Sequence, residues 1–446
     1  MQFLEDFVSK FNTVEYGDEI IPKLYYVRNT DKIEKLENPK QVISDQMDLY
    51  LDRIKPGQKI GLALSSRGID NYAIIVKVII DKIKEAGATP FMIPAMGSHG
   101  GGTAEGQVEY LSGSGITEET MGCKFLSSME TIDLGTIEEG THAYFDKNAS
   151  TMDGIIMCNR VKLHTDFFTK YGSGCVKQMV IGFGKQKGAN ELHHYGVYGL
   201  SHLIPKVARV IWEKMPIIMG VAILENANDK TAKIEVMPRE KIFEREPELL
   251  LESADLMGSL PCDNLDVVIL QEMGKDISGT GLDPNIIGRK GIPGVAERGP
   301  RIYRIGCLDI TEKSHNNALG VGICDIITKR FYDKIDIEAT YMNTLTSRFI
   351  DRARIPIVVK NDKQVITLAL NCCNRFLTKE DARFIMAKNT LQIRDLIVSE
   401  ALIPEIRKMD NYEVVGQVEL KFDENGDLVR YADGSIIPTD TTYQAV

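Results

Sequence analysis

The sequence has few of the features that mark several large classes of protein. Its eight cysteines form no C-x-x-C pair and no regular spacing, which excludes a disulfide framework and the usual zinc and iron–sulfur signatures. No window approaches the ~20 apolar residues that span a bilayer. The first residues, MQFLEDFVSKF, mix acidic and apolar side chains and predict an amphipathic helix, not a signal peptide. A cytoplasmic protein without a membrane partner is expected.

An excess of basic residues is also missing. There are 53 Lys+Arg against 63 Asp+Glu, a net charge of −10, which disfavours a nucleic-acid partner because phosphate binding needs a basic surface. The apolar fraction of 43% is ordinary for a folded protein. A chain of 446 residues exceeds the size of one core, so two domains are predicted, over residues 1–260 and 261–446.

Several catalytic motifs are absent as well. There is no H-E-x-x-H, the commonest zinc-hydrolase signature. The stretch Gly172–Lys177 faintly resembles a phosphate-binding loop, but valine precedes the lysine and glutamine follows it, so ATPase chemistry is not supported. Gly182-Phe183-Gly184 opens no complete G-x-G-x-x-G, which weakens the case for an ordinary nicotinamide dehydrogenase.

The sequence does contain alternating strand and helix patterns, which predict an α/β fold with helices flanking a sheet in each domain and a site in the cleft between them. The first β-α-β unit is Lys59–Leu64, Asn71–Ala86 and Thr89–Pro94. Further buried strands are predicted at 153–160, 217–224, 265–270 and 301–308. In the last hundred residues we expect a hairpin of 355–359 with 364–370, a helix over 379–409, and a closing hairpin over 412–431.

Three of the predicted strands end in a chemically useful side chain: Arg67, His99 and His164. Open α/β sheets bind ligands at the carboxyl ends of their strands. Arg67 could hold a carboxylate or phosphate through its fork of donors, and a solvated turn arginine is the equal alternative. A loop histidine is usually a surface residue, and the shared position at the strand ends is what favours a functional role for His99.

The stretch Val161–His194 concentrates candidate functional groups between glycines. Lys177 lies among apolar residues, where burial favours a neutral, nucleophilic amine; the alternative is a lysine that extends from a half-buried segment to water. His193 and His194 are adjacent, so they point in different directions and at most one can be a metal ligand; the alternative is a polar turn. The combination indicates a cofactor site.

This ordered set resembles the nickel-dependent lactate racemase superfamily of 2-hydroxyacid racemases and epimerases. The similarity lies in Arg67 after a strand, Gly-Ser-His99 after the next, His164, Gly-x-x-Lys177 and then His193. The interval between Lys177 and His193 matches that between the family's cofactor-bearing lysine and its nickel-ligating histidine, which favours His193 over His194.

The resemblance implies a nickel-pincer nucleotide linked covalently to Lys177, with His193 as the protein ligand of nickel and cofactor contacts from Ser66 and Gly174. It implies racemisation or epimerisation by hydride transfer through a 2-keto acid. His99 and His164 would act as the two acid/base groups, and Arg67 would bind the substrate carboxylate. The cofactor must be installed by maturation proteins, which are the implied protein partners.

The carboxyl-terminal half is less similar to the family. Its loop Met273–Asp276 resembles the family's Gly-Tyr-Pro-x-Asp turn, so Lys275 and Asp276 are expected to bind substrate. Because the loop 275–285 is polar, we predict a substrate larger or more polar than lactate, such as a sugar acid. Two alternatives remain: a zinc hydrolase that uses His99, His164 and His193, and a non-catalytic hydroxy-acid-binding protein.

Overall fold

The computed structural model describes residues 20–32, 35–66, 68–166 and 168–430. The chain divides into two compact units, and we describe each by itself. The N-terminal unit is Ile33–Met257, and the C-terminal unit combines Met1–Lys32 with Gly258–Val446. The division at Met257 lies close to the predicted boundary at 260, but residues 20–32 group with the C-terminal unit. The amphipathic helix expected at the start of the chain lies outside the described residues.

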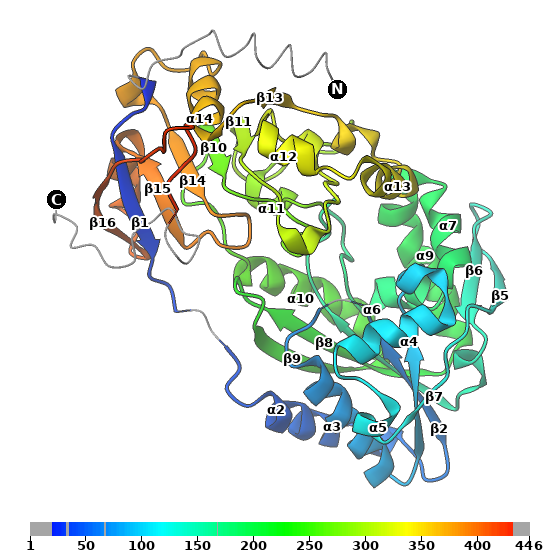
Figure 1. Ribbon diagram of the computed structural model, residues 1–446. Coiled ribbons are helices and arrows are strands. Elements are labelled where there is room, and N and C mark those ends of the chain that lie inside the picture. Colours follow the sequence, from blue (N-terminus) through cyan, green and yellow to red (C-terminus); the bar gives the residue numbers. More distant parts are fainter. Residues whose placement is uncertain (1–19, 33–34, 67, 167, 431–446) are drawn as a thin grey trace. The chain divides into compact units, whose positions relative to one another are not determined.

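The N-terminal unit is built on a six-stranded sheet in the order β4-β3-β2-β7-β8-β9 (Figure 1). All neighbours are parallel except β8 and β9, which are antiparallel. A separate antiparallel pair consists of β5 and β6. The strands are β2 Lys59–Leu64, β3 Thr89–Pro94, β4 Lys124–Phe125, β5 Thr131–Thr136, β6 His142–Asp146, β7 Gly154–Arg160, β8 Ile217–Glu225 and β9 Thr231–Pro238.

Helices bury both faces of this sheet. Along β2, Leu62 and Leu64 join the core under α2 and α3, whereas the alternate residue Ala63 is buried on the other face. This explains why the strands read as continuous apolar runs. The helices are α2 Pro39–Asp48, α3 Tyr72–Glu85, α4 Ala104–Gly113, α5 Glu118–Met121, α6 Cys175–Lys177, α7 Lys185–His193, α8 Gly196–Tyr198, α9 Ile204–Lys214 and α10 Ile242–Leu256.

The C-terminal unit contains an eight-stranded mixed sheet in the order β13-β12-β11-β10-β14-β15-β1-β16. The strands β10 to β14 are parallel, and β15, β1 and β16 extend the sheet in antiparallel fashion. The strands are β1 Leu24–Asn29, β10 Leu265–Leu270, β11 Ile302–Cys307, β12 Ile326–Thr328, β13 Ile357–Val359, β14 Phe384–Ala387, β15 Asp395–Ser399 and β16 Tyr412–Val418. The helices are α11 Pro284–Ile287, α12 Lys329–Lys334, α13 Ile337–Ser347, α14 Asp362–Asn371 and α15 Ile403–Ile406.

Two predictions for this unit are wrong, and a third is confirmed only in part. The expected hairpin over 355–370 is strand β13 followed by helix α14, because the Asn361 side chain accepts from the Gln364 N–H and starts a helix. The expected helix over 379–409 contains strands β14 and β15, whose apolar runs are buried by pairing in the middle of the sheet. The expected closing hairpin is confirmed only near its turn: Phe422 pairs with Leu428 in antiparallel fashion, whereas β16 pairs with β1.

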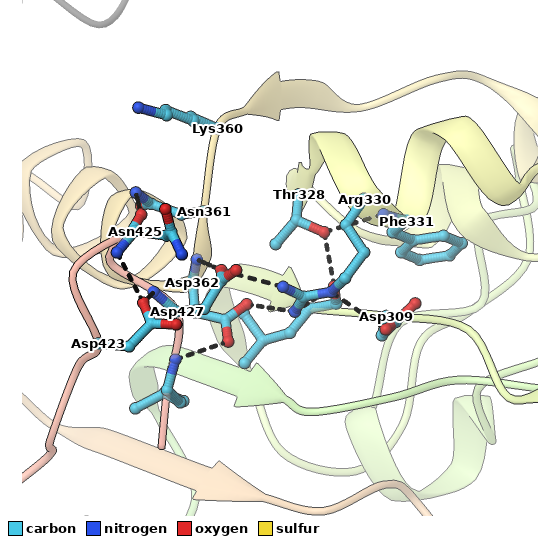
Figure 2. Close-up of polar contacts among 12 residues, drawn as sticks. Asp309, Thr328, Arg330, Phe331, Lys360, Asn361, Asp362, Asp423, Asn425 and Asp427 are labelled. Atoms are coloured by element: carbon cyan, nitrogen blue, oxygen red, sulfur yellow. Dashed lines mark hydrogen bonds and ion pairs between the residues drawn. The ribbon is translucent and has the colours of Figure 1, made fainter. Parts of the chain in front are cut away.

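A charged network joins separate segments of the C-terminal unit. Figure 2 shows the Arg330 guanidinium between three carboxylates. It contacts Asp362, Asp309 at 3.1 Å and Asp427 at 2.9 Å. Asp362 is 1% exposed and also accepts from the Leu428 N–H at 3.0 Å, which joins the turn after β16 to the start of α14.

Candidate active site

The strand order of the N-terminal unit defines where a ligand should bind. From β2 the chain proceeds outward through β3 to β4, and then returns to the other side of β2 with β7 and β8. Such a reversal opens a crevice at the carboxyl ends of the two central strands, here β2 and β7. Ser65 and Ser66 follow β2, and the stretch that includes His164 follows β7. The predicted site residues of this unit therefore belong to the expected edge of the sheet.

Lys177 is the last residue of the short helix α6, which continues into a π-helical turn over Gln178–Gly182. The buried Gln178 side chain donates to the carbonyl oxygens of Ala63 at 3.3 Å and Cys158 at 3.1 Å. Ala63 and Cys158 lie near the carboxyl ends of β2 and β7. Gln178 thus fastens the segment with the half-buried Lys177 to the two strands between which the chain reverses.

The start of this segment contacts a buried carboxyl group. Glu246, on α10, is 1% exposed and accepts from the Val176 N–H at 3.1 Å. Burial raises the pKa of Glu246 to about 7, while N–H bonds from Val176 and Cys175 oppose the rise. A Cβ atom at Gly174 would lie 2.6 Å from the Glu246 carboxyl carbon. Gly174, the predicted cofactor contact, therefore allows Glu246 to approach the backbone.

His99 lies on the loop that follows β3 and is exposed. Its Nδ1 is 2.5 Å from the Ser66 hydroxyl, which is 7% exposed and follows β2. The loop approaches the Lys177 segment closely: Gly97 has φ +63°, and its N–H donates to the Gly182 carbonyl at 3.2 Å. The structure thus joins Ser66, predicted as a cofactor contact, directly to the predicted acid/base residue His99.

His164 lies beyond β7 and is largely covered, with 13% of its side chain exposed. Its Nδ1 accepts from the Asp166 N–H at 3.1 Å, and the Asp166 carboxylate lies 3.7 Å from the same nitrogen. The N–H bond places the proton of a neutral His164 ring on Nε2, because an accepting nitrogen carries no hydrogen. Arg67, the predicted carboxylate ligand, lies outside the described residues.

The two adjacent histidines differ in exposure. His193 is the last residue of α7 and is half-buried, whereas His194 is exposed and packs edge-on against Tyr195, with ring centroids 5.4 Å apart. The sequence preference for His193 as the metal ligand remains a prediction.

The predicted substrate residues of the C-terminal unit lie in the loop after β10. The Lys275 ammonium donates to the Gly279 carbonyl at 2.6 Å, and Thr311 donates to the Asp276 carboxylate at 2.5 Å. The main chain of Lys275 also donates to the Ser314 hydroxyl at 2.7 Å. These contacts hold the loop in a defined shape at the carboxyl end of β10.

Comparison with known proteins identifies the N-terminal part. Residues 29–200 match the family model of the lactate racemase N-terminal domain. This segment is therefore similar to the N-terminal domain of the lactate racemase superfamily. The lactate racemase apoprotein from Thermoanaerobacterium thermosaccharolyticum is 14% identical, with a TM-score of 0.45 over 89% of this chain and 92% of that one. No curated protein matches the sequence.

All the site residues predicted in the first half of the chain fall inside the matched segment. These residues are Ser66, Arg67, His99, His164, Gly174, Lys177 and His193. The recognition made from the residue pattern is therefore confirmed.

Two features of the described residues concern metal and cofactor binding. Within the described part of the chain, no group of three or more His, Cys, Asp or Glu side chains could hold a metal ion. The three histidines of the zinc alternative are thus not gathered around one position. Two buried polar atoms near the end of β2, Ser65 Oγ and Gln178 Oε1, have no partner among the described residues. Unsatisfied buried atoms of this kind are suited to a bound polar group.

Sequence reasoning missed the residues that hold the site together. Gln178 and Glu246 were not singled out, because a glutamine beside Lys177 and a glutamate in an acidic helix look like solvated residues. The available signal for Glu246 was its position in α10, one turn before the buried Leu249 and Leu250. For Gln178 the signal was the apolar run that surrounds it.

None of the described helices is long and apolar enough to cross a membrane.

Proposed function

We propose that this protein is a nickel-dependent racemase or epimerase of a 2-hydroxy acid, with a nickel-pincer nucleotide linked to Lys177. The observation that carries the proposal is the attachment of the Lys177 segment, through Gln178, to the carboxyl ends of β2 and β7. The match of residues 29–200 to the lactate racemase N-terminal domain supports it. His193 would provide the protein ligand to nickel, since imidazole and soft sulfur donors suit Ni(II).

When bound, the nucleotide supplies an acceptor for the substrate's α-hydrogen as hydride, which avoids the poorly acidic α-proton of a carboxylate. The protein's own task is to move the hydroxyl proton. If the His99 ring donates its Nδ1–H to the Ser66 hydroxyl, its lone pair lies on Nε2, where it would accept that proton. A neutral His164 carries its proton on Nε2, so it can return one to the keto oxygen. The two imidazoles thus serve opposite substrate configurations.

The substrate's carboxylate would pair with Arg67, whose guanidinium offers two parallel donors. We propose a substrate larger or more polar than lactate, with Lys275 and Asp276 on the loop that recognises its polar groups. A screen of 2-hydroxy acids should therefore place a sugar acid or similar compound above lactate in kcat/KM. Lactate as the best substrate would refute this part of the proposal.

The first experiment is coexpression with the cofactor-making proteins, because expression alone would give protein without the nucleotide. Intact mass should show a nucleotide adduct with one nickel per chain, and Lys177→Ala should show neither. The loaded protein should exchange the α-hydrogen of its substrate in a 2-hydroxy acid panel. Zinc without a Lys177 adduct would instead support a hydrolase, and binding without exchange would support a non-catalytic protein.

A further inference from the structure

Lys185 is a buried cation between the two parts of the candidate site. It follows the Lys177 segment, begins helix α7, and is 0% exposed. Its ammonium forms an ion pair with Asp146 at 3.0 Å and donates to the Pro94 carbonyl at 2.5 Å. Pro94 is the last residue of β3, directly before the loop that carries His99. Lys185 therefore begins the helix that ends at His193, and its ammonium contacts the strand that leads to His99.

Gln107, on α4, extends this contact to the His99 loop itself. Its side chain is 0% exposed, and its Oε1 accepts from the Lys185 ammonium at 3.3 Å. Its Nε2 donates to the carbonyl oxygens of Gly97 at 2.9 Å and His99 at 3.3 Å. The amide is fixed in one orientation because its oxygen faces a cation and its nitrogen faces two carbonyls.

This arrangement is energetically expensive, which argues that it has a role beyond stability. Burial lowers the pKa of Lys185 and raises the pKa of Asp146, so desolvation opposes both charges. Buried ion pairs are weak contributors to net stability and are best explained where they fix a geometry. Lys185 also has φ +54°, a left-handed conformation that is strained for a lysine.

We propose that Lys185 and Gln107 are positioning residues that set the placement of His99 relative to the Lys177–His193 segment. The carbonyls of Gly97 and His99 are held through Gln107, and Gln107 is oriented by the ammonium of Lys185. The inference rests on the proposed function for its catalytic consequence, whereas the positioning itself is a property of the protein without cofactor.

The test compares Gln107→Met, which keeps the buried charge pair, with the double variant Lys185→Met, Asp146→Asn, which removes it. The protein holds seven histidines, so ring resonances of isotope-labelled histidine can be assigned to His99 with the His99→Asn variant. In the unloaded protein both variants should move the His99 resonances away from those of the wild type, because the contact with Ser66 is altered. In the loaded enzyme kcat should fall by roughly 10- to 100-fold, the effect of a misplacement near 1 Å, with KM changed far less.

Asp362→Asn is the matched control, because it weakens the buried charged network of the C-terminal unit shown in Figure 2. It should lower stability and leave the His99 resonances in place. Folded positioning variants with unchanged His99 resonances, or with kcat within twofold of the wild type, would overturn the inference. If the His99 resonances move but wild-type protein never loads at Lys177, the positioning role stands and the proposed function fails.

Discussion

Glu246 places a carboxyl group where almost no water reaches it, 1% exposed beneath the start of the Lys177 segment. Burial raises its pKa from 4.5 to about 7. Between these two pH values the folded protein retains a proton that the unfolded chain releases, so stability falls as pH rises from 4.5 to 7 and is then level. At neutral pH and above, the buried Glu246 carboxyl group therefore lowers the stability of the site when it ionises.

Replacing the Glu246 carboxyl group by a neutral amide should remove this loss of stability. We expect Glu246→Gln to match the wild type near pH 5 and to gain up to roughly 3 kcal/mol of unfolding free energy of the N-terminal unit at pH 8. The amide oxygen can still accept from the Val176 N–H. Urea unfolding at pH 5, 6, 7 and 8 measures the difference. If the free energies of unfolding of the two proteins change with pH in the same way, the Glu246 carboxyl group is not the cause of the pH dependence.

At the scale of elements, the Gln178 side chain hydrogen-bonds the π-helical turn Gln178–Gly182 to two strands of the sheet. Gln178→Met should cost about 1–3 kcal/mol, because the Ala63 and Cys158 carbonyls lose a buried donor. It should also lower the fraction of protein that carries the nucleotide at Lys177. Intact mass measures this fraction. Gln186→Met, a change of the same type at an exposed position, is the control. Equal loading in both variants would argue against a role for Gln178 in placing the lysine.

The elements also show what sequence patterns can and cannot decide. The run Leu265–Leu270 was predicted to the residue, since six apolar-rich positions between turn residues match a strand buried on both faces. For the short runs at Phe384–Ala387 and Asp395–Ser399 the sequence predicts a helix, but both are strands. Runs of four or five residues are too short for their periodicity to distinguish a helix from a strand. Pairing with strands that are distant in the sequence makes them strands.

The candidate site shows the same limit. His99 and His164 could be placed at the sheet edge from strand order alone, because the carboxyl ends of parallel strands lie together. The contacts that orient them could not be predicted. Ser66 binds His99 across 33 residues of sequence, and Gln107 reaches Gly97 only because α4 folds back on the loop. Such contacts depend on the packing angles of helices, which a local pattern does not contain.

At the scale of the whole molecule, the two units can be perturbed separately. Arg330→Met leaves the buried Asp362 carboxylate without its cation, which should cost about 2–3 kcal/mol; the cost is below the ~3–5 kcal/mol of a fully buried pair because Arg330 is partly exposed. The loss should appear in the C-terminal unit, and loading at Lys177 should be unchanged. Calorimetry combined with intact mass tests both parts. Reduced loading would show that the units depend on one another.

Strand β1 pairs only with strands that are far from it in the sequence. Leu24–Asn29 is synthesised several hundred residues before its two neighbours in the sheet, Asp395–Ser399 and Tyr412–Val418. Until both neighbours have been synthesised, neither edge of β1 has its partner in the sheet. A fragment that begins at Gly258 would therefore lack the strand that joins β15 to β16, and supplying residues 20–32 as a separate peptide should restore it.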